Sequence, residues 1–242
     1  MLQTTRGIVF HQIKYSETSI IVKIYTEQFG LQSFLVRGAR KKNAKIKASQ
    51  LQHLSLVELE VFRKESKDLQ IIKELKVIFP FQSIPLDIRK STILIFLNEV
   101  LYKVIKEEEP NPELFEYIQN VIQILDLKTS NFTTIHFLFL VHLTRFLGFF
   151  PKNNYSISNP NFDLKEGQFS SDIGPESFIS VEPYSKYISM MCDTAFERID
   201  EMKIPTVHKN NLLEIILNYY KHHIPGIIEF KSHAVLKSVF SN

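Results

Sequence analysis

The feature that most constrains the fold is a change in hydrophobic pattern about one third of the way along the chain. Up to residue 80, apolar residues form short segments with strand-like alternation, as in Ile20, Val22 and Ile24 against Lys23 and Tyr25. From residue 85 onward the apolar spacing becomes helical. Five strands are predicted in the first part, over residues 6–14, 19–26, 31–37, 52–63 and 69–79.

The strand spacing indicates a small barrel. Gly30 can supply the positive φ of a tight hairpin turn, so the second and third predicted strands should pair antiparallel. Five strands in about 80 residues, with a longer connection after the third, favour a closed or partly closed OB fold, although an SH3-like barrel would give a similar pattern. We therefore expect an α+β protein of two domains: a five-stranded OB-fold DNA-binding barrel in residues 1–80 and an α-helical domain in residues 81–242.

The second part of the chain has clear helix signals. Asn111 and Pro112 suit the start of a helix, and Gly148 followed by Pro151 suits the end of one. Residues 151–185 are rich in Asn, Ser, Gly and Pro, which predicts an irregular segment with at most short strands. Helices are predicted over residues 86–109, 112–127, 131–147, 185–201, 207–223 and 232–240.

Positive charge is concentrated in the first third of the chain. Residues 1–80 hold 14 Lys and Arg against 7 Asp and Glu, whereas the remaining residues carry an excess of acid, and the whole chain has a net charge of +3. Such a local cluster creates a field that can bind a polyanion. A nucleic acid is therefore expected to bind the first third.

The stretch VRGARKKNAKIK, residues 36–47, contains six basic side chains and no acidic one. It can neutralise phosphates along a strand, while Tyr25, Phe10 or Phe34 on the neighbouring barrel face can stack on a base. The alternative is a solvated, lysine-rich loop. The predicted DNA-binding residues are Arg37, Arg40, Lys41, Lys42, Lys45, Lys47, Lys23 and Tyr25.

Cysteine usage and hydropathy bear on the compartment. The single Cys192 excludes an intrachain disulfide and a multi-cysteine metal site, in keeping with a reducing compartment. The first residues lack the pattern of a secretory signal, and the apolar stretch 135–150 is too short and too interrupted by polar residues to cross a bilayer. We expect a cytoplasmic protein that does not enter a membrane.

No pattern typical of an active site occurs in the sequence, which lacks HExxH, GxGxxG, the P-loop and GxSxG. Cys192 and His208 could be imagined as a nucleophile and its base, but a lone helical cysteine is more often a core residue. Residues 107–109, with Glu113 and Glu116, could gather Mg²⁺, but successive helix positions point apart and carboxylates favour a helix start. We therefore expect that the protein is not an enzyme and that it binds no cofactor or metal.

Phenylalanines crowd the region of the third predicted helix. They either fill the core or form a surface for a partner's hydrophobic residue, and the neighbouring Arg145 and Lys152 would suit an acidic partner. The candidate partner-binding residues are Arg145, Phe149 and Lys152.

Four segments in order resemble the bacterial DNA repair protein RecO family. They are YSETSIIVKIYTEQFGLQSFLVRGARKK (15–42), LNEVLYKVIKEEEPNPELFEYI (97–118), LTRFLGFFP (143–151) and FKSHAVL (230–236). The resemblance spans essentially the whole chain. It implies an N-terminal OB fold, a helical C-terminal domain, binding of single- and double-stranded DNA, and annealing of complementary strands.

The same resemblance implies partners. A recombination mediator of this kind would act in the nucleoid with RecR to place RecA on DNA coated by the single-stranded DNA-binding protein. The acidic, phenylalanine-ending tail of that protein would dock on the helical domain. Family members are not enzymes that make or break bonds.

One departure from the family concerns zinc. Many members hold zinc with four cysteines after the LGF segment, but residues 152–180 contain no cysteine here, so zinc is not expected. The irregular segment should then be held by its own packing, with Phe162, Phe169 and Phe178 docked on the helices.

Two functions of other classes remain open. One is a helical protein-interaction scaffold with no direct DNA role, in which the basic loop is incidental. The other is a metal-dependent nuclease that uses the acidic residues 107–109.

Overall fold

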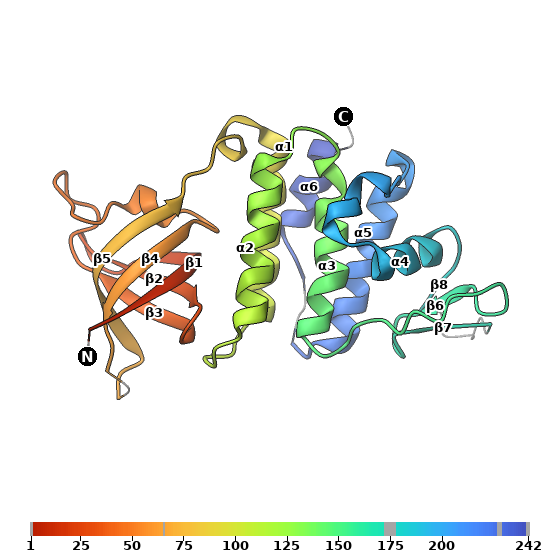
Figure 1. The fold of residues 1–242 in the computed structure, drawn as a ribbon, viewed down its shortest axis with the longest axis horizontal. Helices are drawn as coiled ribbons and strands as arrows, with labels where there is room; N and C mark the ends of the chain where they lie inside the picture. The colour runs from red at the N-terminus through yellow and green to blue at the C-terminus, as the bar shows by residue number, and fades with distance from the viewer. Residues whose placement is uncertain (1, 65, 172–177, 227–228, 241–242) are drawn as a thin grey trace. The chain divides into compact units, whose positions relative to one another are not determined.

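The computed structural model describes residues 2–64, 66–171, 178–226 and 229–240 (Figure 1). The chain divides into two compact units, Met1–Leu127 and Lys128–Asn242. In the described part of the chain, no helix combines the length and the apolar character that crossing a bilayer requires.

The first unit contains a closed barrel with the strand order β1-β2-β3-β5-β4 (Figure 1). β5 pairs parallel with β3, and the other neighbours pair antiparallel. The predicted OB-type barrel of five strands is confirmed. The strands are β1 Leu2–Lys14, β2 Ile20–Thr26, β3 Gly30–Val36, β4 Leu56–Phe62 and β5 Leu69–Phe79.

Alternation along the strands builds the barrel core. Val22 and Ile24 of β2 point inward and are fully buried, whereas Lys23 between them points outward and is half-buried. The β2–β3 hairpin turns at Gly30, whose φ of +61° lies in the left-handed region that glycine adopts without strain. A Cβ at this position would lie 2.5 Å from the carbonyl oxygen of Glu109, so the turn also depends on the absence of a side chain.

Two helices belong to the same unit as the barrel: α1 Ile88–Val104, which follows a short 3₁₀ turn, and α2 Pro112–Leu127. The prediction that the first helix extends to residue 109 is wrong. The chain leaves the helix after Val104 because the next residues reach back to the barrel, where the Leu31 amide donates to the Glu107 carbonyl at 3.1 Å. The predicted start of α2 is confirmed, since the Asn111 side chain accepts a hydrogen bond from the Leu114 amide at 3.0 Å.

The outer face of β1 and β2 is covered by α2. The rings of Phe10 and Tyr25 stack with centroids 5.7 Å apart, and Phe115 of α2 lies against Tyr25 at 6.3 Å. Arg6 of β1 forms ion pairs with Glu27 and with Glu116 of α2. The compact unit therefore extends past the predicted domain boundary at residue 80, and the independent folding of residues 1–80 stays a prediction.

The link into α1 is held by a buried carboxylate near the end of α2. Asp126 accepts hydrogen bonds from the backbone amides of Gln82, Ser83 and Ile84 at 2.8 to 2.9 Å. Burial alone raises a carboxyl pKa, but these three donors hold the pKa of Asp126 below its usual value. The charged side chain thus fixes the direction in which the chain enters α1.

The second unit is mainly helical. Its helices are α3 Ile135–Phe146, α4 Tyr184–Asp193, α5 Thr206–His223 and α6 Ser232–Phe240, with a 3₁₀ helix, η4, at Phe196–Glu201. The prediction of one continuous helix over residues 185–201 is wrong. The helix ends before Thr194, whose backbone is extended and whose hydroxyl donates to the Met190 carbonyl at 2.7 Å.

The irregular segment after α3 contains a small sheet in the order β7-β6-β8, formed by Asn161–Asp163 (β6), Gln168–Ser170 (β7) and Ile179–Ser180 (β8). The prediction of short strands is confirmed. Phe162 and Phe169 are buried, and Phe162 packs on Tyr219 of α5 with centroids 5.3 Å apart. Phe178 is 47% exposed and contacts His222 of the same helix at 4.4 Å. Aromatic packing therefore holds the described part of this segment.

Candidate nucleic-acid interface

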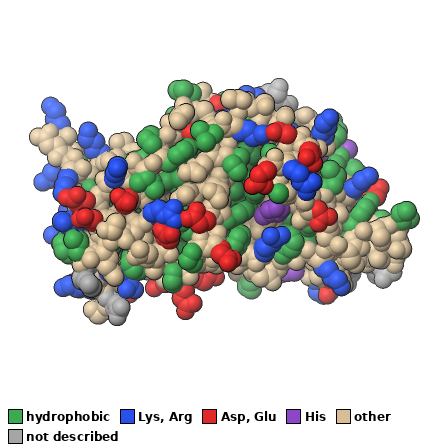
Figure 2. Space-filling model, viewed as in Figure 1, with side chains coloured by type: hydrophobic (Ala, Val, Ile, Leu, Met, Phe, Trp, Pro, Cys, Tyr) green, Lys and Arg blue, Asp and Glu red, His purple; other side chains and the backbone are tan. Residues whose placement is uncertain are grey.

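The basic loop, residues 37–47, leaves the barrel after β3 and returns through a 3₁₀ helix, η1, at Ala48–Leu51. Ala39 and Ile46 insert into the barrel core and fix the loop at two points. The six basic side chains between and beside these anchors are all exposed. Figure 2 shows several Lys and Arg side chains gathered over the barrel. The loop thus combines a fixed backbone with exposed cationic side chains.

Most of the charge in the basic loop is available to a ligand. Lys45 is the exception, since its ammonium lies 2.8 Å from the carboxylate of Glu74 on β5. The Arg40 guanidinium donates to the Glu17 carbonyl oxygen at 3.3 Å, an acceptor that carries no net charge. Within the described residues, no carboxylate lies within ion-pair distance of the four remaining cations, Arg37, Lys41, Lys42 and Lys47.

The turn between β1 and β2 lies directly against the basic loop. The Arg40 amide donates to the Thr18 carbonyl at 3.1 Å, and the Tyr15 amide closes the turn on the Ser19 carbonyl. The ring of Tyr15 is 61% exposed. Base stacking requires an exposed aromatic ring, and Tyr15 offers one beside the cations. The sequence signal that could have identified it is its place in the polar run YSETS, where no strand partner covers a side chain.

The prediction that Tyr25, Phe10 or Phe34 stacks on a base is wrong. Phe34 lies in the barrel core, and Phe10 and Tyr25 form the stacked pair beneath Phe115. All three side chains are no more than 1% exposed, and burial, helped by the charge of Glu107, raises the pKa of Tyr25 to about 12. The predicted site residue Lys23 faces outward from β2, and its ammonium lies 5.6 Å from the centre of the Tyr102 ring.

The candidate partner-binding residues lie at the end of α3 and beyond it. Arg145 is exposed, and its guanidinium lies over the Phe150 ring at 4.4 Å. Phe149 is half-buried and stacks on His223 with centroids 4.9 Å apart, so much of its ring is occupied within the unit. Lys152 is exposed, and its backbone joins it to the small sheet. Two of the three candidate residues, Arg145 and Lys152, are thus exposed cations, and the third, Phe149, is a half-buried ring.

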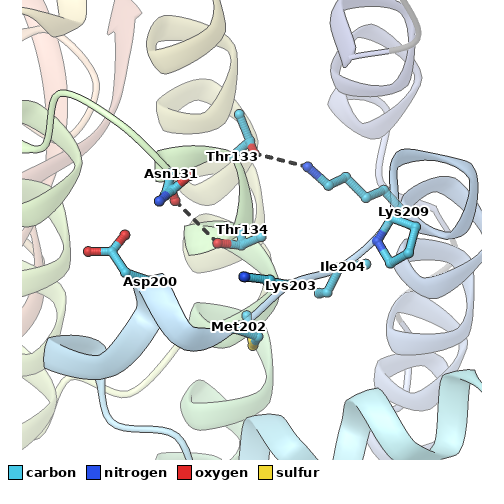
Figure 3. Close-up of a pocket in the computed structure, with 9 residues that line it drawn as sticks. Asn131, Thr133, Thr134, Asp200, Met202, Lys203, Ile204 and Lys209 are labelled. Atoms are coloured by element: carbon cyan, nitrogen blue, oxygen red, sulfur yellow. Dashed lines mark hydrogen bonds between the residues drawn. The ribbon is translucent and has the colours of Figure 1, made fainter.

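A cavity of about 360 Å³ lies elsewhere in the second unit (Figure 3). Lys209 of α5 extends into it, and its ammonium donates to the Thr133 hydroxyl at 3.0 Å. Burial lowers the pKa of Lys209. The cavity's carboxylate, Asp200, pairs instead with Lys128 at 2.7 Å. The lining residues are Asn131, Thr133, Thr134, Asp200, Met202, Lys203, Ile204, Pro205 and Lys209. Lys209 thus places a partly buried ammonium group in this cavity.

The acidic run at residues 107–109 has a structural role. Its backbone packs against Gly30 and accepts the Leu31 amide, and Glu116 pairs with Arg6. Among the described residues there is no group of three or more His, Cys, Asp or Glu side chains placed to hold a metal ion.

Cys192 does not have the character of a nucleophile. Its side chain is buried, and burial, with the charge of Asp193, raises the pKa of the thiol to about 12. His208 lies instead beside Tyr187, with its Nδ1 2.8 Å from the tyrosine hydroxyl.

Comparison with known proteins gives matches along nearly the whole chain. Residues 1–81 match the family model described as Recombination protein O N terminal, and residues 85–233 match Recombination protein O C terminal. A protein of Bacteroides fragilis named DNA repair protein RecO is 38% identical over 99% of this chain and 100% of its own length. Proteins of the same name from Phocaeicola vulgatus and Flavobacterium psychrophilum are each 35% identical, over 100% and 98% of both chains respectively.

Proposed function

Because the chain belongs to the RecO family of DNA repair proteins, we propose that it is a recombination mediator that binds single- and double-stranded DNA through the basic loop and anneals complementary strands. The observation that carries this proposal is the exposed, acid-free cluster of cations anchored in the barrel core at Ala39 and Ile46. Tyr15 supplies an exposed ring beside it.

Annealing by such a surface requires no bond to be made or broken. Two single strands repel each other through their phosphates, and a cationic loop that contacts both backbones lowers this repulsion and raises the local concentration of the strands. Aromatic stacking holds bases without reading their sequence, because every base presents a π face. The protein therefore acts by binding rather than by catalysis.

Protein partners complete the proposed role. With RecR, the protein would place RecA on single-stranded DNA that is coated by the single-stranded DNA-binding protein, in the nucleoid of the cytoplasm. The acidic tail of the coating protein ends in phenylalanine and would dock on the helical unit. The region of Arg145, Phe149 and Lys152 and the cavity at Lys209 both offer a cation beside apolar groups.

An annealing assay tests the proposal. Complementary labelled oligonucleotides, one of them coated with the single-stranded DNA-binding protein, are mixed with the full chain, with and without RecR. We expect faster duplex formation with the protein and a change in rate on addition of RecR. Duplex formation at the uncatalysed rate under both conditions would refute the proposed function and would favour a scaffold role.

A second experiment locates the tail site. A peptide with the acidic, phenylalanine-ending tail is titrated into the full chain and into the variants Arg145→Glu and Lys209→Glu. Loss of a charge-assisted hydrogen bond at the true site should weaken binding about ten-fold or more. Normal peptide binding by both variants would show that neither location is the docking site.

A further inference from the structure

Basic side chains surround Tyr102 near the end of α1. The ammonium groups of Lys23 and Lys106 lie 5.6 and 5.1 Å from the centre of the Tyr102 ring. The His11 ring packs on the same tyrosine with centroids 4.8 Å apart. His11, Lys23, Tyr102 and Lys106 are called the Tyr102 cluster below.

The basic groups of the Tyr102 cluster lie close together and are partly removed from water. Burial, and then the charge of Lys23, lowers the pKa of Lys106. Burial, His53 and Lys23 lower the pKa of His11. Within the described residues, no carboxylate contributes to either shift or pairs with a member of the Tyr102 cluster.

The groups that face His11 come from three elements. Lys23 lies directly opposite His11 in the β1–β2 pairing, Tyr102 faces it from α1, and His53 approaches from the segment before β4. His53 is held by the Asn98 side chain at 3.0 Å and lies 3.3 Å from the Phe10 carbonyl. The carboxylate that α1 carries near this end, Glu99, pairs with Lys103 at 2.8 Å.

An outward-facing path connects the Tyr102 cluster with the basic loop. Lys23 pairs with Ser33 on β3, and two positions back along β2, Ile21 pairs with Ile13 on β1 and with Leu35 on β3. Ile13 is 48% exposed, and Ile21 and Leu35 are half-buried. From Lys23 to the turn that contacts Arg40 is about five residues, or roughly 17 Å of strand. A few nucleotides can span this distance.

We propose that His11, Lys23 and Lys106 form a phosphate-binding site around Tyr102, at which the DNA backbone makes a second contact separate from the basic loop. This inference rests on the proposed DNA-binding function. The aliphatic side chains between the two sites give the intervening bases an apolar surface. The cluster binds the phosphate by charge and by the N–H donors of two ammonium groups and one imidazole.

Binding at this site takes up a proton on His11. In the free protein the imidazole pKa lies below its ordinary value of about 6.5, so the ring is neutral at pH 7. A phosphate beside the ring favours the charged form and raises this pKa. DNA affinity therefore increases as pH falls from the raised pKa of the complex to the lowered pKa of the free protein. One proton limits this dependence to about ten-fold per pH unit.

The experiment compares the full-length protein with His11→Gln and with Lys106→Gln. The matched control is His222→Gln, which removes an exposed histidine of the second unit. Affinity for a single-stranded oligonucleotide is measured from about pH 5.5 to about pH 7.5 at fixed salt. We expect His11→Gln to lose most of the pH dependence of DNA affinity that the control keeps. Lys106→Gln should lower the slope of log affinity against log salt concentration by about 0.7.

The titration of His11 is followed by NMR with inorganic phosphate and with the oligonucleotide, which separates free phosphate from the DNA backbone. A rise of the His11 pKa with both ligands supports the site. A rise with inorganic phosphate alone, or equal pH dependence in His11→Gln and the control, overturns the DNA contact. These outcomes differ from failure of the proposed function, in which DNA binding does not depend on the basic loop at all.

Discussion

Reversing three charges in the basic loop tests the DNA interface directly. The variant replaces Arg40, Lys41 and Lys42 with Glu. All three side chains are exposed, and within the described part of the chain their one side-chain hydrogen bond is that of Arg40 to the Glu17 carbonyl. The loop is held by Ala39 and Ile46, which the change does not touch. The free energy of unfolding should therefore stay within about 0.5 kcal/mol of the wild-type value.

The expected loss follows from the release of counterions. Each phosphate contact to a single strand contributes about 0.7 to the slope of log affinity against log salt, so three lost contacts lower the slope by about 2. Over a four-fold rise in salt, from about 50 to about 200 mM, the wild type should lose roughly 20-fold more affinity than the variant. The loss should be similar for all sequences, because phosphate contacts carry no sequence information.

Fluorescence anisotropy with labelled single strands of two unrelated sequences measures these slopes. The matched control reverses three exposed lysines of the second unit, Lys165, Lys186 and Lys221, and so makes the same change in net charge. Equal slopes for the loop variant and the wild type, or an equal loss in the control, would refute the assignment of the interface to the basic loop.

Three further predictions test other parts of the structure. Asp126→Asn removes the negative charge and replaces one of the two carboxylate oxygens with an NH₂ donor, so at least one of the three backbone amides loses its acceptor and the others lose a charged one. It should lower the free energy of unfolding by about 3 kcal/mol at pH 7, measured by urea unfolding. Because the folded pKa of Asp126 is lowered, its contribution is present above pH 4 or so and is lost as pH falls further, so the two proteins should converge in acid. Gly30→Ala should lower the free energy of unfolding by at least about 2 kcal/mol, because the positive φ adds to a clash with the Glu109 carbonyl. Gly148 also has a positive φ but has open space around it, so Gly148→Ala should lower the free energy of unfolding by about 1 kcal/mol. Equal losses in the two variants would contradict the close approach of Glu109 to Gly30. Tyr15→Ala should weaken binding of single strands about ten-fold and Tyr15→Phe should not, and unchanged anisotropy titrations for Tyr15→Ala would exclude stacking there.

Local patterns predicted most of the fold. The alternation of Val22 and Ile24 with Lys23 placed β2 within one residue of its observed start, and its inward face is correct. The cap at Asn111 placed the start of α2. These predictions succeeded because each depends on side chains that are neighbours in the sequence or on one face of one element.

The failures arise where distant segments meet. The alternation correctly put Tyr25 on the outer face of β2, but nothing near it in the sequence shows that Phe115, 90 residues later, covers that face. The early end of α1 likewise depends on a hydrogen bond between Glu107 and Leu31. The exposed Tyr15 was missed because an exposed turn has no periodic pattern to mark it.

The cover that α2 provides for β1 and β2 has a consequence for how the protein can be divided. A fragment that stops at residue 80 would leave the stacked rings of Phe10 and Tyr25 facing water and would leave Arg6 without Glu116. An open aromatic surface of this kind promotes self-association, so such a fragment should form aggregates or oligomers. Each oligomer would carry several basic loops, and their combined avidity would make DNA binding look tighter than that of one loop. A fragment that stops at residue 127 keeps the rings covered, and we expect it to be the shortest soluble piece that carries the basic loop.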